Sequence, residues 1–152
     1  PELLILDEPV ASLDPIARRE FQQTLLDAVA EHGMTVLVSS HIIADLERFC
    51  DYLVILSPSQ VQLTSRVDAL LQSHKMLVGP RERMESIART HTIVAASGTG
   101  RQCTLMVQTH GPLLDPAWQV HPVSLEDIIF AYLSQSKSTL AGQDGRTLEV
   151  AQ

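Results

Sequence analysis

The sequence predicts an α/β fold, in which part of a parallel sheet with flanking helices is followed by a small α+β unit. Two short apolar runs, Leu3–Leu6 and Thr35–Val38, end in polar side chains, a pattern typical of buried parallel strands. The stretch between them is long enough for one helix and a returning strand, which together make a βαβ unit. We therefore expect both strands to end at the same edge of the sheet.

The helix of this βαβ unit has clear signals at both ends. Asp14 is a favourable N-cap, and Pro15 suits the first helical position. Gly33 is expected to end the helix after about His32, before a strand over Met34–Ser39. Apolar residues recur at helical spacing and predict its buried face: Ala17, Phe21, Leu25 and Ala28.

Shorter elements are expected to follow. They are a helix over Ile42–Phe49, a strand over Tyr52–Leu56, a turn over Ser57–Gln60, a strand over Val61–Thr64 and a helix over Arg66–Ser73.

Residues 74–134 are predicted to form a separate α+β unit. Ser124 and Asp127 mark the start of its last helix as a near capping box, and Trp118 is expected to cover its core. The polar residues 135–152 are expected to be disordered. The other predicted elements are strands over Met76–Val78, Thr92–Ala95 and Gln102–Thr109 and a helix over Pro80–Thr90.

Two adjacent carboxylates follow the first strand. Ligands of open α/β sheets bind beyond the carboxyl ends of the strands, which is where Asp7 and Glu8 lie. Asp7 can hold Mg²⁺ through water, and Glu8 can orient a water that attacks a phosphate. The second strand delivers His41 beside them. Taken alone, acidic strand ends are common in α/β proteins, and His41 could equally be a capping or core histidine.

Three motifs in order resemble the ATP-binding cassette (ABC) ATPases. Leu3–Glu8 resembles their Walker B strand with its catalytic glutamate, Ala11–Asp14 their D-loop, and Ser39–His41 their switch-histidine motif. The resemblance implies a partial P-loop NTPase-type sheet, with residues 1–73 as the C-terminal half of a nucleotide-binding domain. It also implies ATP and Mg²⁺ as cofactors.

The resemblance assigns a role to each matching residue. Glu8 would position the attacking water and His41 would touch the γ-phosphate, so these two are the candidate catalytic residues. Asp7 would hold Mg²⁺. Ser12 and Asp14 would meet the nucleotide through the D-loop, in which Ala11 stands where the family often has serine.

The tail points to one branch of the family. Ser124–Phe130 resembles the segment that closes many ABC exporter ATPases. The implied protein is a cytoplasmic exporter subunit that dimerises and docks on a separate membrane permease at the inner face of the cell membrane. Two other classes stay open, a helicase-like ATPase and a soluble ABC ATPase serving translation or repair.

A phosphate-binding G-x-x-x-x-G-K-[ST] loop does not occur in the 152 residues. We therefore expect a C-terminal fragment that is inactive by itself, and whether it is an enzyme in its own right stays open. The alternative is a truncated, non-catalytic binding or regulatory module that pairs with an intact ABC ATPase.

Composition excludes several other classes. The net charge is −7 and no basic patch is visible, which argues against nucleic acid as a partner. No apolar run approaches the length of a membrane span. The two cysteines lack metal-ligand spacing. Five further histidines are scattered, and we expect them in solvent-facing or loop positions: His32, His74, His91, His110 and His121.

Overall fold

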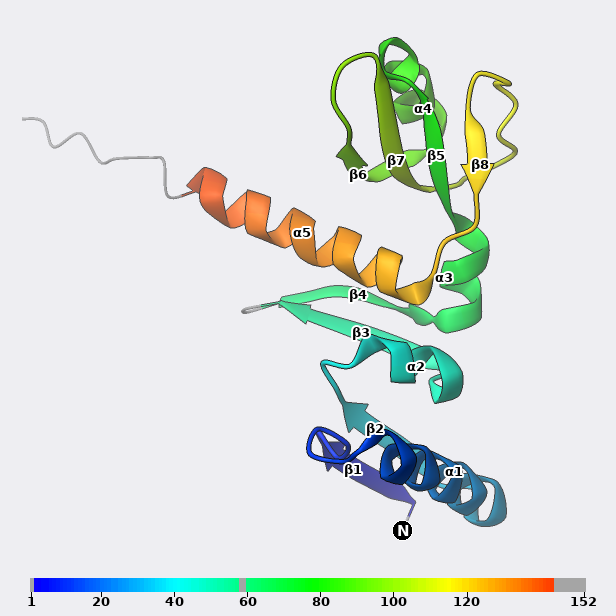
Figure 1. Ribbon diagram of the computed structural model, residues 1–152, viewed down its shortest axis with the longest axis vertical. Helices are drawn as coiled ribbons and strands as arrows, with labels where there is room; N and C mark the ends of the chain where they lie inside the picture. The colour runs from blue at the N-terminus through cyan, green and yellow to red at the C-terminus, as the bar shows by residue number, and fades with distance from the viewer. Residues whose placement is uncertain (1, 58–59, 144–152) are drawn as a thin grey trace, which may run out of the picture. The chain divides into compact units, whose positions relative to one another are not determined.

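The computed structural model describes residues 2–57 and 60–143 and divides the chain into two compact units (Figure 1). The first unit is Pro1–Cys50 and the second is Asp51–Gln152. The expected turn at residues 58–59 and the end of the expected tail, residues 144–152, lie outside the described residues.

The first unit contains the predicted βαβ arrangement. Strand β1 (Leu3–Asp7) pairs in parallel with β2 (Thr35–Ser39), with helix α1 (Pro15–His32) between them in the chain. The register places Asp7 directly opposite Ser39, so both strands end at one edge. A short helix, α2 (Ile43–Phe49), follows.

The ends of α1 have the predicted chemistry. The Asp14 carboxylate accepts hydrogen bonds from the backbone N–H groups of Ile16 (2.9 Å) and Ala17 (3.0 Å), as an N-cap does. Gly33 adopts a φ of 62°, a left-handed conformation that glycine reaches without steric cost, and its N–H bonds the carbonyl of Val29.

The two-stranded sheet is less buried than its apolar sequence predicts. Leu3, Ile5 and Leu37 are 52%, 65% and 56% exposed, whereas the alternate side chains on the other face are partly buried. The prediction of buried strands is therefore wrong, because one face is exposed and the other is only partly buried. A sheet of only two strands has a face that the described residues leave uncovered.

The second unit begins with an antiparallel hairpin and a helix. Strand β3 (Tyr52–Ser57) pairs with β4 (Gln60–Arg66), and helix α3 (Val67–Ser73) follows. Alternate residues of β3, Leu53 and Ile55, are buried.

A four-stranded antiparallel sheet with the order β6-β7-β5-β8 forms the rest of the second unit, together with its helices. Its strands are β5 (His74–Pro80), β6 (Thr92–Ser97), β7 (Gln102–Gln108) and β8 (Gln119–His121). The helices are a 3-10 turn, η1 (Arg81–Arg83), and two α-helices, α4 (Met84–Thr90) and α5 (Leu125–Gln143). Strand β8 is not predicted from the sequence, because three exposed residues carry no alternating pattern.

Helix α5 begins with a true capping box. The Ser124 hydroxyl accepts from the N–H of Asp127 (3.1 Å), and the Asp127 carboxylate accepts from the N–H of Ser124 (3.0 Å). The helix continues to Gln143, so a disordered tail from residue 135 is wrong for residues 135–143. Because α5 packs on β3, β4 and α3 as well as on β6, the compact units divide at residue 50, whereas the sequence places the domain boundary at residue 73.

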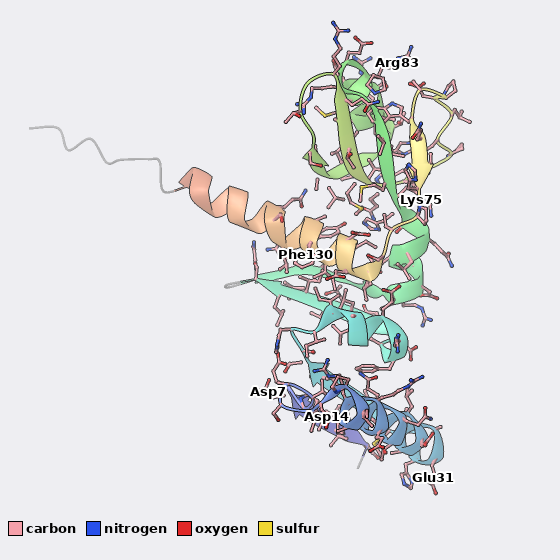
Figure 2. The ribbon with its side chains drawn as sticks, viewed as in Figure 1. Asp7, Asp14, Glu31, Lys75, Arg83 and Phe130 are labelled. Atoms are coloured by element: carbon pink, nitrogen blue, oxygen red, sulfur yellow. The ribbon has the colours of Figure 1, made fainter. Side chains whose placement is uncertain are left out.

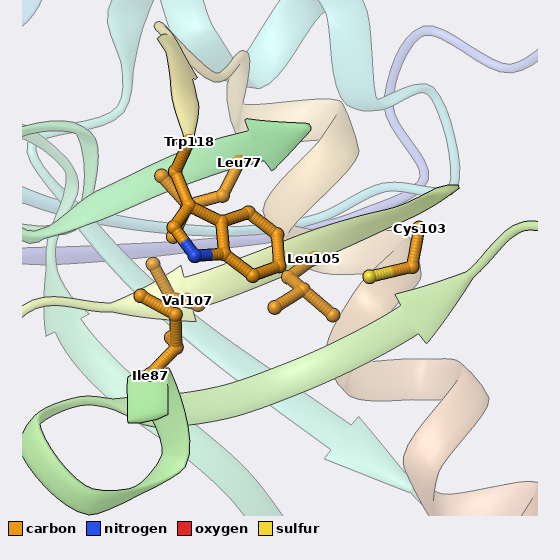
Figure 3. Close-up of a cluster of buried hydrophobic side chains, with 6 residues drawn as sticks. All are labelled: Leu77, Ile87, Cys103, Leu105, Val107 and Trp118. Atoms are coloured by element: carbon orange, nitrogen blue, oxygen red, sulfur yellow. The ribbon is translucent and has the colours of Figure 1, made fainter. Parts of the chain in front are cut away.

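The core of the sheet unit is a cluster around Trp118, which is 5% exposed and confirms the prediction for this residue (Figure 3). The other buried members are Leu77, Ile87, Cys103, Leu105 and Val107. Gly79 lies directly under the indole: a Cβ atom there would come within 2.6 Å of a ring carbon of Trp118. The close approach of backbone and ring therefore requires glycine at this position.

His74, which is expected from the sequence in a solvent-facing or loop position, is buried at the start of strand β5, so for it that prediction is wrong, whereas His91 is buried but does lie in a loop position, the bend between α4 and β6. His74 is 0% exposed and His91 is 7% exposed. His74 Nδ1 donates to the Leu70 carbonyl (2.9 Å), and its Nε2 accepts from the Tyr132 hydroxyl (3.1 Å). Partners for both ring nitrogens let the neutral imidazole lie in the interior. A single histidine in the sequence gives no sign of Tyr132, a partner 58 residues away.

The burial of His74 predicts a loss of stability on acidification. Burial lowers the pKa of His74 below its ordinary value of 6.5, and burial likewise lowers that of His91. Below about pH 6.5 the unfolded chain binds a proton that the folded chain does not, so the free energy of unfolding falls as the pH falls. Urea unfolding between pH 7.5 and 5 should show this fall. The fall should be smaller for His74→Gln, and an equal fall in both proteins would contradict the assignment to His74.

Candidate active site

The edge where β1 and β2 end carries a hydrogen-bonded group of four residues. The Ser39 hydroxyl donates to Asp7 Oδ1 (2.5 Å), and the Glu8 N–H donates to the Ser39 hydroxyl (2.9 Å). The same N–H also lies 3.2 Å from the Ser39 carbonyl oxygen, at the last pair of the parallel ladder, Asp7 and Ser39. Residues that are far apart in the sequence are thus tied together at the carboxyl edge of the sheet, as predicted from the βαβ unit.

His41 completes this group through Glu8. Its Nδ1 lies 2.8 Å from Glu8 Oε2, a distance typical of a hydrogen bond to a carboxylate. The His41 side chain is 70% exposed and that of Glu8 is 37% exposed, so both are open to a ligand. The structure therefore brings His41 beside the carboxylates.

Glu8 has an unusual backbone. Its φ is +47°, the only positive φ at a non-glycine residue among those that the structure describes. A side chain in the left-handed region costs about 1–2 kcal/mol, and such strain concentrates at functional sites. The conformation turns the chain sharply from the strand into a tight turn, in which the N–H of Ala11 bonds the Glu8 carbonyl (3.2 Å).

The remaining candidates lie outside the hydrogen-bonded group. Ser12 is exposed in the loop between β1 and α1, and Asp14 ends that loop. Figure 2 labels Asp7 and Asp14 at the two ends of this loop. One Asp14 oxygen is already committed to the helix cap, so its role in the structure is the start of α1. The hydrogen bonds linking Asp7, Glu8, Ser39 and His41 include neither Ser12 nor Asp14.

The side chains at this edge suit a hard cation such as Mg²⁺. They offer carboxylate oxygens from Asp7 and Glu8, and Asp7 is exposed. Mg²⁺ in phosphoryl-transfer sites binds one or two carboxylates and takes its remaining ligands from water and phosphate. Within the described residues no group of three or more His, Cys, Asp or Glu could hold a metal ion, so an all-protein cage is not what this edge provides.

Two features of the site were not predicted from the sequence. The sequence places Ser39 only within a motif, and its link to Asp7 depends on the strand register. The signal that could have found it is the equal length of the two strands, because each ends one residue after its apolar run. The left-handed backbone of Glu8 has no sequence signal, since glutamate rarely adopts it.

Comparison with known proteins shows that part of the chain is similar in sequence to ABC transporter ATP-binding proteins. The chain is 44% identical over 61 residues to one from Mycoplasma pneumoniae and 43% identical over 61 residues to one from Bacillus subtilis. It is 38% identical over 69 residues to a phosphonates import ATP-binding protein of Maricaulis maris. These matches cover 40%, 40% and 45% of this chain, and no protein-family model matches it.

The chain spans only about a fifth to a quarter of these relatives: 19%, 20% and 26% of their lengths. A solved structure, an inward-facing metal-chelate type ABC transporter, aligns with a TM-score of 0.39 at 19% identity, covering 72% of this chain and 41% of the other. Among the described residues, no helix is both long and apolar enough to cross a membrane.

Proposed function

Because it is similar to part of the ABC transporter ATP-binding proteins, we propose that this chain belongs to an ATP-hydrolysing subunit that powers transport. Glu8 is the residue that orients the attacking water, and His41 is the residue that contacts the γ-phosphate. The observation that carries the proposal is the hydrogen-bonded group at the carboxyl edge of β1 and β2, in which Glu8 and His41 lie 2.8 Å apart.

Each side chain has a task that its chemistry allows. The Glu8 carboxylate accepts a hydrogen bond from the water and directs its lone pair toward phosphorus. His41 holds the Glu8 carboxylate through Nδ1, so it orients the same group that orients the water. Asp7 would hold the Mg²⁺ through water, and the ion would supply positive charge beside the phosphates.

The assembly follows from the same resemblance. We propose that Ser12 and Asp14 lie where the subunit meets an ATPase dimer partner, and that a permease on another chain carries the membrane spans. The complex would then work as an exporter at the cytoplasmic face of the cell membrane. The support for export is the resemblance of Ser124–Phe130 to exporter tails, while the similar protein from Maricaulis maris is named for import.

A second candidate is a non-catalytic module that pairs with an intact ABC ATPase. It is favoured by one observation: the 152 residues contain no G-x-x-x-x-G-K-[ST] loop. That loop cradles the phosphates with backbone N–H groups and a lysine, and positioning supplies most of the catalysis of phosphoryl transfer. We therefore propose that these 152 residues alone do not turn over ATP.

The native protein decides between the two candidates. Its intact mass, determined after capture from source cells with an antibody against residues 20–48, is compared with the 16.7 kDa of this chain. A larger protein that hydrolyses MgATP and co-purifies with an integral-membrane protein supports the transporter subunit. A native protein of 16.7 kDa without ATPase activity, bound to an intact ABC ATPase, supports the module.

A further inference from the structure

The Ser39 hydroxyl contacts both residues of the acidic pair. It lies 2.5 Å from Asp7 Oδ1 and 2.9 Å from the backbone nitrogen of Glu8. An N–H group can only donate and a carboxylate accepts, so the direction of both hydrogen bonds is fixed. The single hydroxyl proton points to Asp7, and a lone pair of the oxygen receives the Glu8 N–H.

The two hydrogen bonds of the Ser39 hydroxyl hold different groups, the carboxylate of Asp7 and the backbone of Glu8. The bond to Asp7 fixes the orientation of its carboxylate at the end of β1. The bond from Glu8 holds the backbone just where φ is +47°, and so supports a conformation that is strained by itself. That conformation in turn places the Glu8 carboxylate on His41.

We propose that Ser39 is a positioning residue for ATP hydrolysis. Its single hydroxyl group orients Asp7 for metal binding and Glu8 for contact with the water. This inference rests on the proposed function. Ser39 acts through Asp7 and Glu8. Removal of a polar group that holds a metal-binding carboxylate typically changes metal affinity or activity about 10- to 100-fold.

The strand register explains why the serine stands at this position. Asp7 and Ser39 are direct partners across the parallel pair, so a short side chain with a hydroxyl group spans the gap. Threonine keeps the hydroxyl and favours a strand, whereas alanine removes it. Thr35 offers a matched control because it lies on the same face at the other end of β2.

The experiment measures metal binding without turnover. Mn²⁺ replaces Mg²⁺, a non-hydrolysable ATP analogue is present, and electron paramagnetic resonance gives the Mn²⁺ dissociation constant of the full-length protein. The variants are Ser39→Ala, Ser39→Thr, Ser39→Cys and the control Thr35→Ala. Steady-state hydrolysis is then followed against Mg²⁺ concentration.

Ser39→Ala is expected to weaken Mn²⁺ binding about 10-fold and to raise the Mg²⁺ needed for half-maximal hydrolysis by a similar factor. Ser39→Thr should restore binding to within about three-fold, and Thr35→Ala should bind as the unsubstituted protein does. If Ser39→Ala does not fold, Ser39→Cys carries the test, because it keeps the size of serine with a weak S–H donor. Mn²⁺ affinities of Ser39→Ala and Ser39→Cys within two-fold of the unsubstituted value would overturn the inference.

The failure of this inference can be told from the failure of the proposed function. Unchanged Mn²⁺ affinity in the Ser39 variants, together with hydrolysis that depends on Glu8, removes the role of Ser39 alone. If hydrolysis by the full-length protein is the same with and without Glu8, the proposed function falls, and the inference falls with it.

Discussion

Glu8→Gln in the full-length protein lowers the maximal rate of ATP hydrolysis by about 100-fold or more, the usual contribution of a positioned acid–base group. Glutamine has nearly the shape of glutamate, so it keeps a hydrogen bond to His41 within reach, but it lacks the negative charge that orients and polarises the water. ATP binding should change little, because the role proposed for Glu8 is toward the attacking water and not toward the nucleotide. The measurement is the rate at saturating MgATP, together with the nucleotide dissociation constant.

Glu31→Gln is the matched control for this substitution. Glu31 is 76% exposed in the last turn of α1, before β2 begins, whereas the site residues lie at the carboxyl ends of β1 and β2; Figure 2 labels Glu31. The same chemical change at Glu31 is expected to leave the hydrolysis rate within two-fold. If the Glu8→Gln protein keeps more than a tenth of the original hydrolysis rate, Glu8 does not take part in the reaction.

Leu105→Ala is expected to destabilise the second unit by about 2–5 kcal/mol. Leu105 is 0% exposed in the central strand β7 and packs in the cluster of Trp118 and Leu77, as Figure 3 shows. Truncating it loses apolar burial and leaves a cavity in a closely packed interior. Urea unfolding measures the loss through the fluorescence of Trp118, the single tryptophan of the chain, which reports on this same cluster.

Leu114→Ala makes the same chemical change at a residue that is 82% exposed. Its expected cost is below about 0.5 kcal/mol, as for most surface substitutions. Equal losses for the two variants would show that the cluster around Trp118 is not the core of this unit.

The elements that the sequence predicts best are those with both a pattern and a cap. Helix α1 begins and ends where Asp14 and Gly33 indicate, because local hydrogen bonds and backbone conformation decide those ends. Strand β8 is not predicted from the sequence, because its three exposed residues form a strand only through their pairing with β5. Helix α5 also packs against β3 and β4, which the sequence places in another domain.

The grouping of the site residues was predictable from the sequence, because it depends on the direction of the strands. The contacts that depend on strand register were not predictable. Parallel strands that end in Asp7-Glu8 and in Ser39–His41 must meet at one edge, so the grouping follows from topology. The hydroxyl of Ser39 becomes a partner of Asp7 only in the observed register. The burial of His74 likewise depends on Tyr132, 58 residues away, which no local pattern reveals.

We propose the edge formed by Asp7, Glu8 and His41 as the site of MgATP hydrolysis. A crystal structure of the full-length Glu8→Gln protein, grown with ATP and Mg²⁺, tests it most directly. The metal is expected at the carboxylate of Asp7, directly or through water, with the γ-phosphate next to His41 and a water next to residue 8. Nucleotide bound elsewhere, with neither metal nor phosphate at this edge, would contradict it.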